Sequence, residues 1–188
     1  MGLTYERIKQ GKMKKTKTIK SRLRSMITVS SNDSFNYLLK RNGGGKYSIG
    51  INRVNSFCKR HGYKSTTTRG TLAPTVYSGY HKGTAGTSVR DCGHILEDMY
   101  RGTLVSESAS KEMISYLKNQ KRRWKIPAGL PKGVECANKT GEVPGMEHDA
   151  AIVYSKDADY IIVVMTKGDG NAISHIRSVS KTVYNYFN

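Results

Sequence analysis

Apolar residues in the first two thirds of the chain recur at the three- and four-residue spacing of α-helices. The clearest set lies within residues 49–60 and ends before Gly62, a residue type that commonly terminates helices. Ser88, with Asp91 three residues later, is a capping-box start signal, and Ser21 is predicted to cap a shorter helix. The predicted helices cover residues 4–10, 21–27, 32–40, 49–60, 88–100 and 106–118.

After residue 133 the pattern becomes strand-like. Three segments joined by short turns predict an antiparallel meander over residues 134–140, 149–154 and 160–166. The third is apolar from Tyr160 to Met165, so we expect it to be covered on both faces. A final helix over residues 171–187 is predicted to cover one face through the apolar side chains Ile173, Ile176, Val179, Val183 and Phe187. The helical block of residues 21–118 would cover part of the other.

This order of elements predicts an α+β fold, with an antiparallel sheet, a C-terminal helix on one face and an all-helical subdomain beside it. At 188 residues we expect a single domain over 1–188, helical over about 1–125, with sheet and final helix over about 133–188. The stretch 63–87 has no clear period and is predicted to be a long irregular loop, of a length that is usually functional or disordered.

The formal charge of +18 and the isoelectric point near 9.9 predict affinity for polyanions. Basic residues concentrate in 7–24 and 118–125, and the segment 12–20 is expected to be an exposed connection. Nucleic-acid binding is one alternative, with Trp124 placed to stack on a base. It is disfavoured because no nucleic-acid-binding motif appears. The second alternative is a basic surface that binds an anionic cell wall.

Cys58, Cys92 and Cys136 are widely spaced and resemble small core residues more than a metal or disulfide set. His61, just before Gly62, fits a helix end better than a ligand, so we expect no metal and no cofactor. No apolar run predicts a membrane span, and no signal peptide is predicted in this chain.

Lys139-Thr140-Gly141 would place a cation, a hydroxyl and a backbone without Cβ side by side at the end of a strand. Such an edge suits an anionic ligand in an adjoining cleft. The alternative is a strand followed by a tight glycine turn, and the tripeptide alone favours that alternative.

The surrounding sequence favours the ligand-binding interpretation of Lys139-Thr140-Gly141 over the glycine turn. The segments are Met26-Ile27-Thr28-Val29-Ser30-Ser31-Asn32, then Ile126-Pro127-Ala128-Gly129-Leu130-Pro131, then Lys139-Thr140-Gly141, then His148-Asp149-Ala150-Ala151-Ile152-Val153-Tyr154. In this order the chain resembles the serine β-lactamase and penicillin-binding protein superfamily, and is most similar to class A β-lactamases. The resemblance covers nearly the whole chain and implies hydrolysis of a β-lactam through an acyl-enzyme.

The resemblance implies roles for six residues. Ser30 would relay a proton to the leaving nitrogen, and Asn32 would bind the substrate's side-chain amide. Lys139 and Thr140 would bind the substrate carboxylate. Gly141 would allow close approach of the substrate, and the backbone N–H of Glu142 would donate to the oxyanion.

Two departures from the family pattern favour the penicillin-binding, D-alanyl-D-alanine peptidase-like alternative or a divergent β-lactamase-like protein. Ser31 stands where β-lactamases carry Asp, as in the looser Ser-x-Asn of penicillin-binding proteins. The loop 63–87 contains no Glu to act as the deacylating base, so an acyl-enzyme would turn over slowly.

A third departure is that no Ser-x-x-Lys precedes Ser30. The four matches begin later, at Ser56, Ser108, Ser115 and Ser178. We therefore expect the chain to be an N-terminally truncated fragment that is inactive by itself.

The expected loss of neighbouring strands would leave residues 160–166 as an open apolar edge. Through it the fragment would form a homodimer or bind an N-terminal half. A β-lactam or a D-alanyl-D-alanine-like peptide is the expected ligand, and the resemblance implies an extracellular or cell-envelope location. A non-catalytic module that binds cell-wall polyanions remains an alternative.

Overall fold

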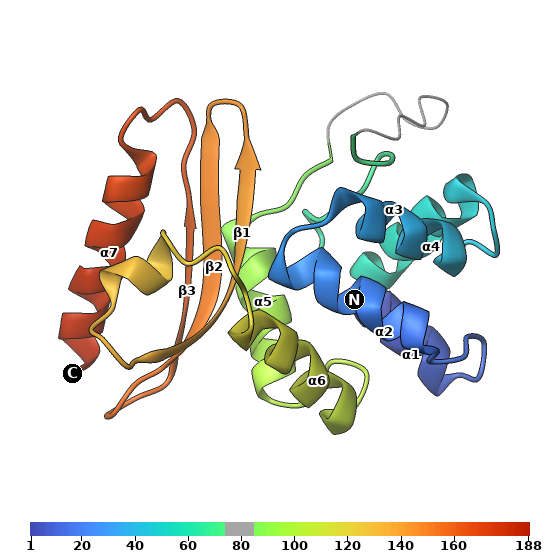
Figure 1. Ribbon diagram of the computed structural model, residues 1–188, viewed down its shortest axis with the longest axis horizontal. Helices are drawn as coiled ribbons and strands as arrows, with labels where there is room; N and C mark the ends of the chain where they lie inside the picture. Colours follow the sequence, from blue (N-terminus) through green and yellow to red (C-terminus); the bar gives the residue numbers. More distant parts are fainter. Residues whose placement is uncertain (74–84) are drawn as a thin grey trace.

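The computed structural model describes residues 1–73 and 85–188 (Figure 1). The helices are α1 (Gly2–Lys9), α2 (Lys17–Thr28), α3 (Asn32–Asn42), α4 (Tyr47–Arg60), α5 (Val89–Tyr100), α6 (Glu107–Lys118), the 3₁₀ helix η1 (Ile126–Gly129) and α7 (Ala172–Phe187). The strands are β1 (Glu135–Val143), β2 (Met146–Tyr154) and β3 (Tyr160–Met165). The α+β architecture predicted from the sequence is confirmed.

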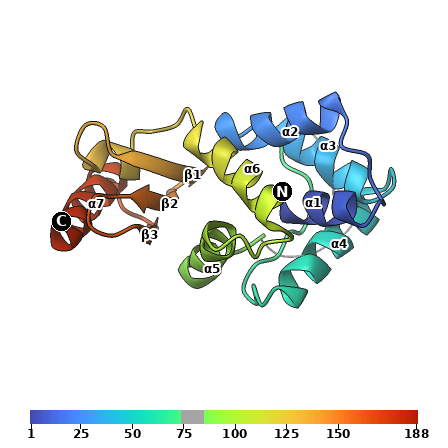
Figure 2. The ribbon, with the colours of Figure 1, turned by 90° about the horizontal axis from the view of Figure 1, so that it is seen from below.

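The sheet separates α7 from the helical block. Its strands are antiparallel in the order β1-β2-β3, with Lys139 opposite Ala150 and His148 opposite Met165. Figure 2 shows α7 on one side of the sheet and α5 and α6 on the other, with α1 to α4 beyond them. Because side chains alternate along a strand, odd and even positions of β1 face different helices.

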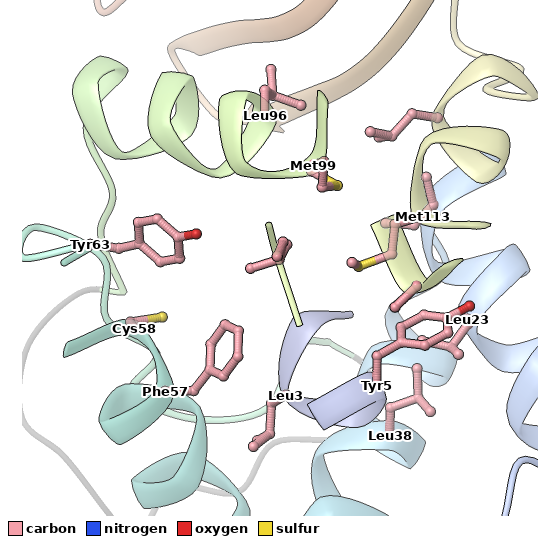
Figure 3. Close-up of a cluster of buried hydrophobic side chains, with 14 of the residues drawn as sticks. Leu3, Tyr5, Leu23, Leu38, Phe57, Cys58, Tyr63, Leu96, Met99 and Met113 are labelled. Carbon is pink, nitrogen blue, oxygen red and sulfur yellow. The ribbon is translucent and has the colours of Figure 1, made fainter. Parts of the chain in front are cut away.

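Two apolar cores follow from this layering. The larger one lies within the helical block and reaches the sheet at Ala137 and Ile152. Figure 3 shows its centre, where Phe57, Met99 and Met113 point toward one another from three helices. The smaller core joins the other face of the sheet to η1 and α7 and contains Ile126 and Ile176.

The start of α2 corrects one sequence prediction. Ser21 does not cap a helix, because α2 begins at Lys17 and the Thr16 hydroxyl accepts a hydrogen bond from Ile19 N at 3.2 Å. The basic segment 12–20 is therefore partly helical. Its composition predicts a connection because its lysines are exposed, while the buried Ile19 anchors the helix. By contrast, Ser88 caps α5 as predicted, and Ser106 caps α6 in the same way.

The buried face of helix α7 agrees only in part with the predicted one: Ile176 is buried and Val183 packs against the smaller core as predicted, but Val179 and Phe187 are exposed. Its buried residues are Ala172, Ile176 and Ser180, whereas Val179 is 41% exposed. Ser180 can be buried because its hydroxyl donates to Ile126 O at 2.8 Å. The apolar pattern did not identify this position because its side chain is polar.

Strand β3 is covered less completely than its apolar sequence predicts. Tyr160 and Ile162 are buried toward α7, but Ile161, Val163 and Met165 are only half-buried on the side of the helical block. Within the described residues, β3 pairs with β2 alone and forms one edge of the sheet. The pairing of this edge with a partner stays a prediction.

We expect this edge to drive self-association, because it combines unpaired backbone groups with half-buried apolar side chains. Light scattering across a concentration series should show masses above the 20.9 kDa of one chain. Val163→Lys should reduce the association, whereas Val179→Lys on the exposed side of α7 should not. A single mass of one chain at every concentration would contradict the prediction.

The long loop predicted over residues 63–87 lies partly outside the described residues. In the part that is described, Thr67 and Gly86 form an isolated antiparallel bridge. His61 follows the last residue of α4, as the sequence predicts, and Cys58 and Cys136 are buried. In the described ranges, no helix is long and apolar enough to span a membrane.

Candidate functional site

The site forms where β1 meets the connection between α2 and α3. Lys139 lies on the odd face of β1, which looks toward the helical block. Its ammonium donates hydrogen bonds to Ser30 Oγ and, at 2.5 Å, to Thr140 O. Ser30 and Lys139 are 109 positions apart in the sequence, so the fold alone brings them together.

Ser30 lies in a strained backbone position. Its φ is 55°, in the left-handed region that non-glycine residues seldom adopt. The next residue, Ser31, caps α3 by accepting a hydrogen bond from Ser34 N at 3.2 Å, and Ser31 N donates to Ser25 O in α2. Both ends of this connection are thus held, and the strain is maintained where Ser30 meets Lys139.

A cavity of about 530 Å³ opens beside this contact. All six residues to which the resemblance assigns roles line it, namely Ser30, Asn32, Lys139, Thr140, Gly141 and Glu142. Arg122, Phe35 and Leu72 are also in the lining. The cavity therefore combines two cationic side chains, several hydroxyl and amide groups, and apolar walls.

The predicted ligand-binding groups differ in their availability. Asn32 Nδ2 donates to Ala73 O at 2.9 Å, so its amide is engaged with the loop. The Thr140 hydroxyl is buried and has no hydrogen-bond partner within the described part of the chain. A Cβ on Gly141 would lie 3.5 Å from His148 Cβ, an ordinary contact, so this glycine is not required by its protein neighbours.

The surroundings of Lys139 lower the pKa of its side chain. A second, apolar cavity of about 350 Å³ adjoins the site and is lined by Leu96, Met99 and Met113 from the helical block. Burial among these groups, with the Arg122 guanidinium nearby, lowers the pKa of Lys139 to about 8. Near neutral pH the ammonium form still dominates, but the neutral amine is accessible.

Asp149 of β2 makes hydrogen bonds on the face of the sheet that packs against η1 and α7. It is buried opposite Thr140 and accepts hydrogen bonds from Ile126 N at 3.0 Å and from Asn138 Nδ2 at 3.1 Å. Burial raises the pKa of this carboxyl to about 6 despite those bonds. The contacts tie η1 to the strand that carries Lys139.

Sequence reasoning missed two cations at the end of the β1–β2 hairpin. Arg122 pairs with Glu142 at 2.6 Å, and the fully buried Lys125 pairs with Glu142 at 3.2 Å and with Glu147 at 2.6 Å. Lys125 Nζ also donates to Gly141 O at 3.3 Å. Both cations belong to a basic run whose composition predicts an exposed surface, and only the register that places Glu142 opposite Glu147 reveals their role.

The four Ser-x-x-Lys sequences do not supply a serine to this site. Those of Ser56, Ser108, Ser115 and Ser178 lie on α4, α6, α6 and α7, and none of the four serines is among the described residues lining either cavity. Across the described ranges there is also no group of three or more His, Cys, Asp or Glu side chains that could hold a metal ion.

Comparison with known proteins identifies the family. A sequence model described as the β-lactamase enzyme family matches residues 5–187. The chain belongs to this family. No curated protein matches the chain.

Solved structures with the same fold are similar over nearly the whole chain. PBP-A has a TM-score of 0.82 and 22% identity, over 99% of this chain and 77% of that one. The putative class A β-lactamase PenP from Rhodopseudomonas palustris has a TM-score of 0.83 and 20% identity, over 98% and 80% of the two chains. This family member therefore has the fold of class A β-lactamases and of PBP-A.

Proposed function

We propose that the cavity beside Lys139 binds β-lactams or D-alanyl-D-alanine-like peptides and serves acyl transfer. The observation that carries the proposal is the contact of Lys139 with Ser30 at a cavity that the six expected residues line. Family membership supports the reaction class. A variant of PBP-A is described as an acyl-enzyme complex with penicillin G, which supports the ligand class.

The charges and hydroxyls of the cavity fit such a ligand. Lys139 and Arg122 are the cations in its lining, and a ligand carboxylate placed beside them would form charge-assisted hydrogen bonds. The Thr140 hydroxyl is buried and has no hydrogen-bond partner among the described residues, so a ligand carboxylate that reached it would break no existing bond there. Phe35 and Leu72 offer apolar surface to the rest of the ligand.

We do not expect the residues that line this cavity to hydrolyse a β-lactam as fast as a β-lactamase does. The serines of the four Ser-x-x-Lys sequences are not among the described cavity-lining residues. Glu142, the carboxylate in the lining, is paired with Arg122 and Lys125 and is not free to activate water. We infer a site that binds its ligand and does not turn it over efficiently.

Ligand binding should depend on Lys139. Lys139→Gln should weaken binding of benzylpenicillin and of an acetylated D-alanyl-D-alanine peptide about tenfold or more, because it removes one charge-assisted hydrogen bond. Titration calorimetry or amide chemical shifts would measure the affinity. The control Lys111→Gln changes an exposed lysine on α6 and should leave the affinity unchanged. Equal affinities of the two variants would contradict the proposal.

A further inference from the structure

Helix α2 carries a row of cations on its exposed side. Lys17, Lys20 and Arg24 recur at three- and four-residue spacing and are exposed, whereas Ile19 and Leu23 of the same helix are buried. At the rise of an α-helix, successive cations of the row lie about 4.5 Å and about 6 Å apart along the axis. Figure 2 shows α2 along the outer margin of the helical block. We call Lys17, Lys20 and Arg24 the α2 row.

No carboxylate neutralises the α2 row. Residues 7–32 contain no Asp or Glu, so α2 has no acidic residue of its own. Glu112 of the neighbouring α6 is paired with Lys15 and also accepts a hydrogen bond from the Tyr116 hydroxyl. Within residues 1–73 and 85–188, no ion pair joins the row to a carboxylate. Its three charges therefore face solvent uncompensated.

The α2 row is unfavourable for the helix that carries it. Cations near the N-terminus of a helix oppose its macrodipole, and Lys17 and Lys20 both lie in the first turn of α2. Like charges three and four positions apart also repel each other. The core does not require these side chains, because they are exposed. A row that lowers stability without contributing to packing is typical of a binding surface, and a bound polyanion would relieve both effects.

The α2 row leads to the cavity beside Lys139. Thr28, the last residue of α2, accepts a hydrogen bond from the backbone N–H of the exposed Lys121 at 2.9 Å. The next residue, Arg122, lines the cavity, and so does Ser30, two positions after Thr28. A polymer lying along α2 toward Thr28 would therefore end at residues that border the cavity.

We propose that the α2 row binds an anionic phosphodiester polymer of the cell wall, such as a poly(glycerol phosphate) chain. Each phosphodiester carries one charge and has oxygen atoms that accept hydrogen bonds from lysine and arginine. A flexible chain can place its phosphates at successive cations of the row. The choice of a polyanion rests on the row alone. The choice of a wall polymer rests on the proposed function, because a D-alanyl-D-alanine-like peptide belongs to the same wall.

Nucleic acid is the competing phosphodiester polymer. Proteins that bind single strands without sequence preference combine cations with aromatic side chains on which the bases stack. Helix α2 contains no aromatic residue, and the exposed residues between its cations are Thr18 and Ser21. The row therefore favours a polymer without bases.

Binding of a fluorescent poly(glycerol phosphate) to the full chain tests the inference. Fluorescence anisotropy across a salt series gives the affinity and its salt dependence. The variant Lys17→Gln/Lys20→Gln/Arg24→Gln should bind at least about tenfold more weakly, and the slope of log affinity against log salt should fall by about 2.

The matched control is Lys132→Gln/Lys156→Gln/Lys181→Gln. It removes the same number of exposed cations near the sheet and α7, so the two variants have the same net charge. The control should change the affinity less than about twofold. Equal losses in the two variants would overturn the inference, because net charge alone would then explain the binding.

Thermal denaturation excludes loss of folding as the cause. Neutralising the α2 row removes unfavourable charges, so the free variant should melt at or above the temperature of the natural chain. The polymer should raise the melting temperature of the natural chain and of the control, but not that of the row variant. An equal rise in all three proteins would contradict a site at the row.

Two comparisons identify which proposal has failed. A single-stranded oligonucleotide with the same number of phosphates should bind more weakly than the wall polymer, and tighter binding would overturn the assignment to the wall. The row variant should bind benzylpenicillin like the natural chain, because none of its three residues is among the described residues lining the cavity. Penicillin binding without polymer binding would overturn this inference alone. Polymer binding without penicillin binding would overturn the proposed function alone.

Discussion

Replacing Lys125 by methionine is expected to lower the free energy of unfolding by about 3 kcal/mol, because it breaks the ion pairs of a buried lysine and leaves Glu147 without its cation. Lys125 is fully buried and pairs with Glu142 and Glu147, which face each other across β1 and β2. Like charges opposite each other on a sheet repel, so the hairpin that ends at the site should open. Chemical denaturation followed by circular dichroism measures the loss.

The matched control is Lys111→Met. Lys111 pairs with Glu107 on α6, but both side chains are more than two thirds exposed, so we expect no measurable change in stability. Adding Glu147→Gln to Lys125→Met should recover part of the loss, because one of the two facing charges disappears. If the two lysine variants were equally stable, the buried cation would not hold the hairpin.

The sequence predicts the elements well where burial follows a regular period. The helices α3 and α4 and all the strands lie within a few residues of their predicted bounds, because each buries one stripe or one face of apolar side chains. The early start of α2 is not predicted, because a run of lysines is typical of an exposed connection. The capping hydroxyl of Thr16 and the buried Ile19 outweigh that composition.

The site was predictable only through family resemblance. Neither charge nor spacing places Ser30 against Lys139, because the contact joins positions 109 residues apart. Arg122 and Lys125 were missed for a physical reason. Lysine and arginine are exposed in most proteins, and only the pairing of Glu142 with Glu147 creates a buried place for a cation.

Gly50→Ala is expected to lower the free energy of unfolding by about 3 kcal/mol, because overpacking at a backbone contact forces the helices apart. Gly50 is in α4 where that helix crosses α3, and a Cβ there would lie 2.1 Å from Leu39 O. A backbone oxygen within a helix cannot move aside alone, so α3 must shift as a body. Thermal and chemical denaturation measure the effect.

Gly93→Ala is the matched control, since it makes the same change within helix α5. A Cβ on Gly93 meets nothing within 4 Å, so alanine should raise the free energy of unfolding by about 0.5–1 kcal/mol through helix propensity. The changes in the free energy of unfolding should therefore have opposite signs in the two variants. Two losses of equal size would show that the contact between α3 and α4 is not what requires glycine at position 50.

The effect of Gly50→Ala should also reach the ligand site. Leu39 lies near the C-terminal end of α3. The N-terminal end of the same helix is Asn32, which directly follows the strained Ser30 and the capping residue Ser31. A shift of α3 would loosen the contact of Ser30 with Lys139, so Gly50→Ala should weaken ligand binding even where the protein remains folded. Gly93→Ala leaves α3 in place and should not alter ligand binding, which separates the effect of a displaced site from that of a change in stability.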